Sequence, residues 1–385
     1  MKQRIVVLGA GFGGMELSTI LSENVPDDVD VTLIDRSDRF VFGYAKLDVM
    51  FGRTTPAAVR LPYAEFVKPG VNLVRDTVVA IDPERRHVTT TSGSFDADVL
   101  VIALGADHDL AATPGLTEGD EFYSVAGAGG MRARVEAFTS GSAVIGVCAA
   151  PYKCPPAPSE CALLLHDDLV SRGVRDRCGI TLVLPFGKPI PPSPDTSAAL
   201  VSAFAERDIN LVPSAKVRAL DSDRGMVVLE SGDELAYDLF LGVPKHCAPD
   251  VVVASGLTVD GYVPVDPATL ETQAAGVYAI GDVATQGTPK AGVFAEGAAR
   301  ALAATLIARI RGSDAAGVHT GKGSCFIEFG DDRVGRVDID FLSGPSPTGT
   351  FQAPSPLLRA EKEHFGSSRR ARWFGRTAPE AAGAV

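Results

Sequence analysis

The chain has 385 residues, of which 45% are hydrophobic and 22% charged, a composition that suits two or three globular domains with their own cores. Its formal net charge of −12 provides no positive field for phosphate groups, so we expect no nucleic-acid partner. Six cysteines in a chain of this length do not indicate a disulfide-stabilised scaffold.

The chain runs from Met1 almost directly into an apolar strand, so we expect neither a secretory leader nor a transit peptide. No window approaches the roughly 18 uninterrupted apolar residues of a membrane-spanning helix. These features predict a cytoplasmic protein.

The first predicted elements are a strand at residues 5–8, a helix at 15–22 and a second strand at 31–34. Later segments continue this alternation. Further strands are predicted at residues 99–104, 143–147, 180–184 and 277–280, and further helices at 156–170 and 292–310.

Two segments, 71–105 and 226–243, share one design, in which two short strands flank a glycine-containing turn and a buried strand follows. From about Ser313 the pattern changes to β-hairpins, then to a stretch rich in proline, glycine and serine, and finally to a basic tail. The duplication is weak, but it suggests two domains of similar design followed by a smaller one.

The pattern therefore predicts an α/β fold with two Rossmann-like dinucleotide-binding domains of the FAD/NAD(P)-binding type and a small C-terminal α+β domain. We place the first part of the FAD-binding domain at residues 1–110 and its second part at 262–312. The second Rossmann-like domain spans 111–261, and the C-terminal domain with its basic amphipathic tail spans 313–385.

Gly9, Gly11 and Gly14 form a G-x-G-x-x-G sequence between the first strand and the first helix. The missing side chains let backbone amides approach a pyrophosphate at the helix N-terminus, and Asp35, about 20 residues on, can accept hydrogen bonds from ribose hydroxyls. Because strand, helix and acid all occur in the required order, we predict a dinucleotide site; the alternative is a structural glycine turn.

Two later segments, "VLVIALGA" with Gly105 and "GVYAIGDVA" with Gly281 and Asp282, resemble the later motifs of flavoproteins with two dinucleotide-binding domains. In those proteins an acid at the position of Asp282 holds the ribityl chain of FAD. The alternative is two buried strands that each end in a glycine turn.

A helix that begins near Gly292 would direct its free amides at the flavin N1 and C2 carbonyl and stabilise the anion of the reduced flavin. Lys290 would add a positive charge there; alternatively, it is a solvated lysine before a helix.

The second predicted Rossmann unit lacks a nicotinamide fingerprint. Its first strand continues as Cys148-Ala149-Ala150-Pro151, and its next strand ends in Pro185-Phe186-Gly187 without an acid or arginine for a ribose. We therefore argue against NAD(P)H as the electron donor.

Cys154 lies where the second phosphate loop would be, before Pro155-Pro156 and a predicted helix, with Lys153 beside it. A helix N-terminus and a lysine both favour a thiolate. Cys161, two helical turns on, could share its face or could be a small core residue.

The segments "PYKCPPAPSE", "GDVATQGTPKAG" and "GKGSCFIEFG" resemble those of the sulfide:quinone oxidoreductase and flavocytochrome c sulfide dehydrogenase group, a branch of the flavoprotein disulfide reductases. The resemblance spans nearly the whole chain. It implies that Cys154 and Cys325 form a redox-active disulfide or sulfur bridge over FAD, which requires α-carbons within roughly 7 Å; two unrelated cysteines are the alternative.

In the implied reaction, hydrosulfide attacks the bridge, a persulfide forms and two electrons pass through FAD to a quinone at its other face. Glu160, near the cysteine helix, and His246 are candidate proton carriers, with solvated or capping roles as the alternatives. Cys148, Cys178 and Cys247 are interpreted as packing residues.

The tail at residues 357–376 carries six Lys/Arg against two Glu, interspersed with leucine and aromatic side chains. Such a segment can lie on an anionic membrane with its rings inserted, near the quinone pool at the inner face of the cell membrane. The Gly-Ser-Ser at 366–368 is expected to interrupt a continuous helix. The alternative is a tail packed on the protein's own acidic surface or at a subunit contact.

The expected partners are thus sulfide or a small sulfur compound, a quinone and, at a subunit contact, a second copy of the chain; no metal site is indicated. A haem protein is the other acceptor known in the group, but no C-x-x-C-H sequence occurs here. Because no cysteine lies near residues 39–43, we expect FAD to be bound non-covalently. Two other functions remain open: an NAD(P)H:quinone reductase of the same fold, and a non-catalytic flavin and thiol redox sensor.

Overall fold

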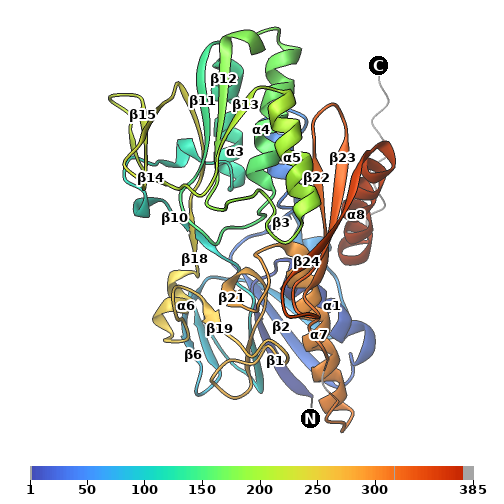
Figure 1. The fold of residues 1–385 in the computed structure, drawn as a ribbon. Helices are drawn as coiled ribbons and strands as arrows, with labels where there is room; N and C mark the ends of the chain where they lie inside the picture. Colours follow the sequence, from blue (N-terminus) through green and yellow to red (C-terminus); the bar gives the residue numbers. More distant parts are fainter. Residues whose placement is uncertain (1, 316, 376–385) are drawn as a thin grey trace.

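The computed structural model describes residues 2–315 and 317–375. Two parallel sheets lie one above the other in Figure 1, and a smaller antiparallel sheet with helix α8 lies along one side. Arg376, the last residue of the predicted tail segment, and the end of the predicted C-terminal domain lie outside the described residues.

The central strands of the first parallel sheet are short apolar runs that are buried on both faces, as parallel strands usually are, whereas its edge strand β5 is partly exposed. Its strand order is β20-β9-β1-β2-β5. The strands are β1 (Gln3–Leu8), β2 (Val29–Asp35), β5 (Val71–Arg75), β9 (Val99–Ile102) and β20 (Val277–Ala279). Helices α1 (Phe12–Asn24) and α7 (Gly292–Ile310) pack against each other beside it.

The topology brings the predicted motifs to one edge of this sheet. The glycine turn follows β1, Asp35 ends β2, Gly105 follows β9 and Gly281 follows β20. Because parallel strands share one carboxyl edge, motifs that are far apart in the sequence meet there.

The second parallel sheet has the strand order β13-β12-β11-β17. Its strands are β11 (Gly141–Val147), β12 (Cys178–Val183), β13 (Ile209–Val212) and β17 (Leu239–Val243), and its helices are α3 (Val125–Ala137), α4 (Ala157–Ser171) and α5 (Pro194–Glu206). Helix α4 follows the segment that replaces the second phosphate loop.

The predicted internal duplication is present in the structure. Three-stranded antiparallel ribbons precede β9 and β17, and the first strand of each ribbon has a register shift, between Val78 and Ala80 and between Val217 and Ala219. The ribbons are β6 (Val78–Asp82), β7 (His87–Thr90) and β8 (Ser94–Asp96), and β14 (Val217–Asp221), β15 (Met226–Leu229) and β16 (Glu234–Ala236).

Short elements connect these parts. They are β3 (Arg39–Val41) with β4 (Arg60–Pro62), β10 (Asp107–Asp109) with β18 (Lys245–Cys247), β19 (Val263–Pro264) with β21 (Ala284–Thr285), and helices α2 (Ala45–Met50) and α6 (Asp250–Ala254). Strand β10 follows β9 and strand β18 follows β17, so this pair joins the ends of the two duplicated segments.

The C-terminal part is a three-stranded antiparallel sheet followed by one helix. Its elements are β22 (Lys322–Glu328), β23 (Val334–Asp340), β24 (Thr348–Ser355) and α8 (Pro356–Phe374). Side chains alternate along each strand, so one face is apolar, with Ile327 and Val337 fully buried, while the other face carries mostly polar side chains. The two-Rossmann-domain α/β fold with a small α+β domain is confirmed, whereas the domain boundaries stay predictions.

Helix α8 differs from the expectation in two ways. It runs without interruption through residues 366–368, because Gly366 packs against Tyr44, where an added Cβ would lie 2.2 Å from the tyrosine hydroxyl oxygen. Its aromatic residues Trp373 and Phe374 are 1% and 6% exposed. The prediction that these rings insert into a membrane is therefore wrong, and the alternative of a tail packed on the protein holds for them.

The arginines of α8 also bind within the protein. Arg369 pairs with Glu296 of α7, and Arg372 pairs with Glu16 and Glu23 of α1. Across the described residues, no helix combines the length and apolar character that a membrane crossing requires.

Candidate active site

The glycine turn after β1 has two kinds of glycine. Gly9 has φ +101°, and a Cβ on it would lie 2.4 Å from the Ala103 carbonyl oxygen; a Cβ on Gly14 would lie 1.9 Å from the Gly9 oxygen. These two are required by the fold. A Cβ on Gly11 would meet nothing within 4 Å, so Gly11 leaves open space at the N-terminus of α1, as a pyrophosphate needs.

Asp35 is held beside this turn. Its Oδ2 accepts a hydrogen bond of 2.8 Å from the Ala10 amide, and its Oδ1 accepts one of 2.8 Å from the Ser37 amide. Burial raises the pKa of this carboxyl, and the two amides oppose that shift. The carboxylate is thus fixed where it could bind the ribose of a dinucleotide whose pyrophosphate lies at Gly11.

A cavity of about 280 Å³ lies between this edge of the sheet, helix α4 and strand β22. Most of the residues predicted for the site line it. They are Gly11, Gly105, Gly281, Asp282, Lys290, Gly292, Cys154, Glu160 and Cys325. The remaining three residues are not part of the cavity wall. Gly9 and Gly14 shape the glycine turn itself, and Asp35 is hydrogen-bonded to it.

Lys290 and Asp282 form the polar end of the cavity. The Lys290 ammonium donates a hydrogen bond of 2.6 Å to the Asp282 carbonyl oxygen and lies 3.4 Å from the centre of the Tyr262 ring. Burial lowers the pKa of Lys290 to about 8, and the Asp282 carboxylate opposes the shift. Helix α7 begins at Gly292, and Ala291 provides no side-chain cap, so the first amides of the helix stay available at the cavity wall.

Cys154 and Cys325 reach the cavity from different elements. Cys154 has φ 51°, its amide donates a hydrogen bond of 2.8 Å to the Lys290 carbonyl, and its own carbonyl accepts one of 2.9 Å from Ala157. Cys325 lies in the middle of β22. Both are free thiols.

The expected thiolate at Cys154 is not favoured here. Burial raises the pKa of its thiol, and the charges of Glu160 and Cys325 raise it further. Burial likewise raises the pKa of Cys325 to about 12. Lys153 does not offset these effects, because its ammonium donates to the Ala106 carbonyl at 2.9 Å.

Glu160 lies near both thiols, since its charge acts on each of them. Its side chain is 5% exposed, and its Oε1 accepts a hydrogen bond of 3.0 Å from the Glu328 amide. Burial raises the pKa of this carboxyl to about 7, against the opposing charge of Lys362. Glu160 can therefore gain or lose a proton near neutral pH.

His246, the other candidate proton carrier, does not belong to the cavity wall as the structure describes it. Its Nδ1 lies 2.9 Å from the Pro244 carbonyl, and its ring packs against His108 and Tyr123. Burial lowers its pKa to about 2, so this imidazole stays neutral in the folded protein.

The remaining cysteines are also placed away from the wall of this cavity in the described part of the chain: Cys148, Cys161, Cys178 and Cys247. Cys161 is fully buried in the core, which agrees with its reading as a packing residue.

Several cavity residues carry no sequence motif and were not predicted. They are Tyr44, Lys46, Tyr123, Lys362 and Phe365. Lys46 donates a hydrogen bond to the Tyr123 carbonyl, and burial lowers its pKa to about 8. Lys362 and Phe365 are three residues apart on one face of α8, and this spacing was the one available signal for them.

A second cavity, of about 450 Å³, meets the first at Cys325, Lys290 and Ala291. Its wall is mostly proline and aromatic. The lining includes Pro151, Tyr152, Pro155, Phe186, Pro191, Phe294 and Phe341. The segment that replaced the nicotinamide loop thus forms an apolar approach to Cys325.

A third cavity, of about 710 Å³, opens on the other face of β22 and is called the outer cleft below. It meets the first cavity at Ser324 and Phe326, which neighbour Cys325 in the strand. Successive side chains of a strand point to opposite faces. Cys325 therefore faces the apolar approach, while Ser324 and Phe326 face the outer cleft.

No group of three or more His, Cys, Asp or Glu side chains that could hold a metal ion occurs within the described ranges. The site is therefore built from a glycine cradle, buried lysines, two thiols and the two carboxyls of Glu160 and Asp282. Such groups suit a dinucleotide and sulfur chemistry.

Comparison with known proteins supports this interpretation. Residues 3–299 match the model of the pyridine nucleotide-disulphide oxidoreductase family. A sulfide-quinone reductase of Aquifex aeolicus is 25% identical over 359 residues, which cover 86% of this chain and 82% of the relative. A mitochondrial sulfide:quinone oxidoreductase of Dictyostelium discoideum is 24% identical over 318 residues, which cover 79% and 70% of the two chains.

The crystal structure of the sulfide:quinone oxidoreductase from Aquifex aeolicus has a TM-score of 0.82 to this fold, with 21% identity, and the match covers 98% of this chain and 93% of that one. The glycine cradle and the open space at Gly11 fit the cofactor of such proteins. The chain therefore belongs to the pyridine nucleotide-disulphide oxidoreductase family, and it is an FAD-dependent oxidoreductase similar to the sulfide-quinone reductases.

Proposed function

We propose that this protein oxidises sulfide, or a related small sulfur compound, through Cys154 and Cys325 and passes two electrons by way of FAD to a quinone. The observation that carries the proposal is that both thiols line the same cavity as the dinucleotide motifs, while Cys325 also lines a separate apolar approach. The two named relatives, which are sulfide-quinone reductases, support the same assignment.

In the proposed cycle the oxidised protein contains a disulfide between Cys154 and Cys325. Hydrosulfide attacks one of its sulfurs, so a new S–S bond forms, the bond between the cysteines breaks, and the other cysteine leaves as a thiolate. A second hydrosulfide takes the outer sulfur as hydrogen disulfide, and the persulfide cysteine returns to a thiol.

The thiol and the thiolate then re-form their disulfide by losing two electrons and one proton, which FAD held by the glycine turn would accept. Each cycle thus joins two hydrosulfide ions into one hydrogen disulfide ion. The quinone takes up the two electrons together with two protons and leaves as the quinol. When bound, FAD supplies the two-electron transfer between these two half-reactions.

The protein's own groups assist this chemistry. Glu160, with its pKa near 7, can accept the proton of an attacking sulfur species and return it to a leaving thiolate. The uncapped amides of α7 and the ammonium of Lys290 face the cavity end where a reduced flavin would carry negative charge. Burial of both thiols raises their pKa values, so each cysteine is a neutral thiol until a proton is removed from it.

The anaerobic test compares sulfide titrations of the holoenzyme with those of Cys154→Ser and Cys325→Ser. We expect sulfide to bleach the flavin of the parent protein and not of either variant. Cys247→Ser, at a half-buried cysteine outside the cavity, is the matched control and should bleach normally. Unchanged bleaching in both active-site variants would remove the cysteine pair from the mechanism.

The same experiment separates the two alternatives. An NAD(P)H:quinone reductase would be reduced rapidly by NADH and not by sulfide, but the proline-rich segment at the second phosphate-loop position argues against this. A redox sensor would show a titratable disulfide with no turnover of any quinone. We further propose that FAD is non-covalent, which acid precipitation tests by releasing all the flavin into the supernatant.

A further inference from the structure

The apolar approach, the cavity of about 450 Å³ that leads to Cys325, has a wall rich in proline. Eight of the 17 described residues that line it are Pro151, Pro155, Pro156, Pro189, Pro191, Pro192, Pro289 and Pro347. Proline has no backbone N–H group, so none of these residues can donate a main-chain hydrogen bond to a ligand. Such a wall does not suit an anion.

The polar side chains of this wall are already engaged within the protein. Among the described residues that line it, only Tyr152 and Lys290 carry a side-chain oxygen or nitrogen. The Tyr152 hydroxyl donates to the Pro155 carbonyl at 3.3 Å. The Lys290 ammonium donates to the carbonyls of Asp282 and Ala284 at 2.6 and 3.5 Å. A charged substituent would therefore lose its hydration here without gaining a free side-chain donor.

The apolar approach is also much larger than a single sulfur atom requires. One water has a share of about 30 Å³ in the liquid, and a hydrosulfide ion is on the same scale. Such an ion would leave most of the space to water, which needs about two to four polar partners for each molecule. A ligand with an apolar body would instead fill the space and remove apolar surface from water.

Aromatic side chains complete the wall from two parts of the molecule. Tyr152 and Phe186, of the second Rossmann-like domain, stack with ring centres 6.3 Å apart at 23°. Phe294 of α7 and Phe341, which follows β23, pack edge to face at 5.4 Å and 88°. Tyr152 and Phe294 are buried, so their rings are held in place as a preformed apolar surface.

The apolar approach runs from the surface to one of the two reactive sulfurs. Pro191 and Pro347 are exposed, whereas Cys325 lies where this cavity meets the cavity of the dinucleotide motifs. Of the three cavities in the described part of the chain, Cys154 lines only the one with the dinucleotide motifs. A ligand in the apolar approach therefore reaches Cys325.

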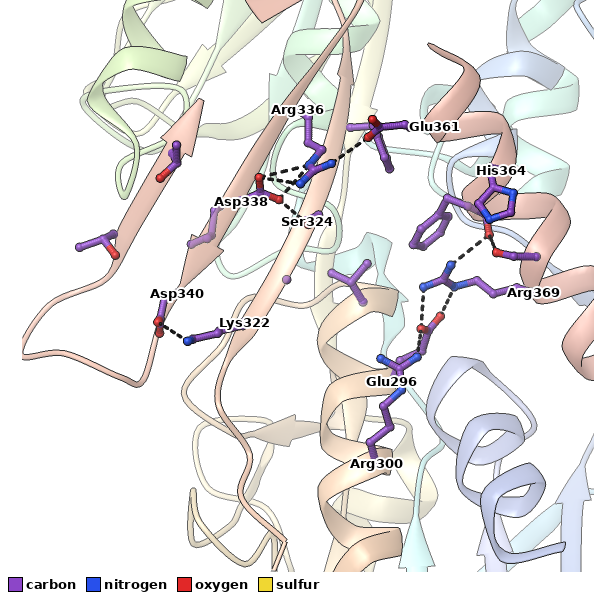
Figure 2. A pocket seen from close by; sticks show the side chains of 18 residues that line it. Glu296, Arg300, Lys322, Ser324, Arg336, Asp338, Asp340, Glu361, His364 and Arg369 are labelled. Atoms are coloured by element: carbon purple, nitrogen blue, oxygen red, sulfur yellow. Dashed lines mark hydrogen bonds and ion pairs between the residues drawn. The ribbon is translucent and has the colours of Figure 1, made fainter. Parts of the chain in front are cut away.

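The other side of β22 is built differently. Figure 2 shows ion pairs across the outer cleft, where Arg336 lies between Asp338 at 2.9 Å and Glu361 at 2.8 Å. Cys325 is not among the described residues that line this cleft. The charged groups near β22 thus lie away from the reactive sulfur, and the apolar wall selects what reaches it.

We propose that the sulfur substrate is an organic thiol with an apolar alkyl or aryl body, which the apolar approach binds with its sulfur at Cys325. This inference rests on the proposed function, because it names the substrate class for the same cysteine pair. Two molecules of the thiol leave as their disulfide.

The reaction follows the exchange steps of the proposed cycle. The substrate gives its proton to Glu160 and attacks Cys325, so a mixed disulfide forms, the bond between Cys154 and Cys325 breaks, and Cys154 leaves as a thiolate. A second substrate attacks the substrate sulfur of this mixed disulfide, which releases the substrate disulfide, and its proton passes to the departing Cys325. The cysteine pair is then a thiol and a thiolate, as before, and two thiols are oxidised for each quinone reduced.

The test compares phenylethanethiol with mercaptoethanesulfonate as anaerobic reductants of the flavin in the holoenzyme. Both are primary thiols, and each rate constant is divided by that of the same thiol with a soluble aromatic disulfide, which removes the difference in intrinsic reactivity. We expect the normalised rate constant of the apolar thiol to be larger by about tenfold or more, with one phenylethyl disulfide formed for each flavin reduced. Equal or reversed rate constants would overturn the inference.

A variant at the exposed end of the apolar approach locates the effect. Pro191→Arg adds a cation there, and we expect it to lower the ratio of the two rate constants about threefold or more. Pro114→Arg is the matched control, at an exposed proline that lines none of the three cavities in the described residues, and should leave the ratio unchanged. The same ratio in both variants would place the thiol outside the apolar approach and contradict the inference.

A readout without turnover uses the Cys154→Ser holoprotein, in which Cys325 cannot form the bridge. Benzyl and sulfonatoethyl methanethiosulfonate each attach to a thiol as a mixed disulfide and release methanesulfinate. Peptide mass spectrometry should show that the benzyl reagent labels Cys325 faster by about tenfold or more, after each rate is divided by that with free cysteine. Equal relative rates would show that the wall does not select apolar bodies and would also overturn the inference.

The two proposals fail in different ways. If sulfide bleaches the flavin through both cysteines and the apolar thiol has no advantage over the sulfonate, only the inference fails. If the apolar thiol reduces the flavin and sulfide does not, the inference stands and the assignment of sulfide as the donor fails. If no sulfur compound reduces the flavin, both fail.

Discussion

Glu160 is the residue in which burial and chemistry are most closely linked. Its carboxyl is in a buried cavity beside two thiols, and that burial raises its pKa from the usual 4.5 to about 7. Between these two pKa values the carboxyl is neutral in the folded protein and ionised in the unfolded chain, so the free energy of unfolding falls as the pH rises from 4.5 to about 7. The stability of the protein should therefore fall across this window.

We predict that Glu160→Gln removes this pH dependence. The amide keeps an oxygen to accept the Glu328 amide but has no charge to bury. Relative to the parent, the variant should gain stability as the pH rises from about 4.5 to about 7, by about 3 kcal/mol, and gain no more above pH 8. Urea unfolding at several pH values measures this difference. A constant difference between the two proteins from pH 5 to pH 8 would show that Glu160 titrates normally.

The glycine turn allows binding to be separated from folding at two neighbouring residues. A Cβ on Gly14 would lie 1.9 Å from a backbone oxygen, whereas one on Gly11 would meet nothing within 4 Å. We predict that Gly11→Ala leaves the melting temperature of the apoprotein almost unchanged but weakens FAD binding about tenfold or more, because the methyl group fills the space for the pyrophosphate.

Gly14→Ala is the matched comparison and should instead destabilise the apoprotein by several kcal/mol, because backbone must move. Differential scanning fluorimetry of the apoproteins and a fluorescence titration with FAD measure the two effects. If Gly11→Ala bound FAD as tightly as the parent, the placement of the FAD pyrophosphate in the open space at Gly11 would be wrong.

Sequence reasoning found the residues whose type and spacing reflect a local requirement. Gly9, Gly14 and Asp35 belong to a strand, turn and helix that are continuous in the chain. Lys46 was missed because it is an ordinary lysine whose role depends on burial by distant segments. The state of Cys154 was misjudged for the same reason, since a helix N-terminus and a nearby lysine are visible in the sequence but desolvation is not.

At the scale of elements, α8 shows how composition can mislead. Its arginines and aromatic residues resemble a membrane-binding segment, but they match two buried carboxylates. Glu16 of α1 and Glu296 of α7 are 2% and 1% exposed, and they pair with Arg372 and Arg369. The sequence of α8 cannot show these partners, because they lie in helices that are 73 and 356 residues away in the chain.

Gly366 shows how α8 fits the protein. In a solvent-exposed helix Gly366→Ala would add up to about 1 kcal/mol of stability. Here the new Cβ would lie 2.2 Å from the Tyr44 hydroxyl oxygen, while the next atom of that ring is 3.4 Å away. We predict that Gly366→Ala destabilises the protein by about 1–3 kcal/mol, as measured by urea unfolding.

The rescue follows from the same distances. Tyr44→Phe removes only the oxygen, so the double variant Gly366→Ala/Tyr44→Phe should recover the stability of Tyr44→Phe alone or exceed it. If Gly366→Ala were as stable as the parent, α8 would not be held against Tyr44 as the structure has it.

At the scale of the whole molecule, the cofactor site is the place where most parts of the chain meet. Gly11 comes from the first turn of the chain, Cys154 and Glu160 from the second Rossmann-like half, and Phe365 from the last helix. The parallel topology of each half could be predicted from the sequence, because alternating strands and helices permit few arrangements. The position of α8 over the cavity could not, because it depends on side-chain pairing between distant elements.

This convergence predicts that FAD stabilises the last helix together with the first sheet. Free FAD at a hundred times its dissociation constant should stabilise the holoprotein by about 2.7 kcal/mol, so its melting temperature should rise steadily with the logarithm of the FAD concentration.

Lys362 and Phe365 line the cavity, so removal of FAD should also make α8 a faster trypsin substrate, with cleavage after Lys362 and Arg370. The exposed Arg85 in the β6–β7 turn is the internal control, since its cleavage should not change with FAD. Protection of α8 that is the same in the apoprotein and the holoprotein would mean that the helix is held by its own ion pairs and buried aromatic side chains without help from the cofactor.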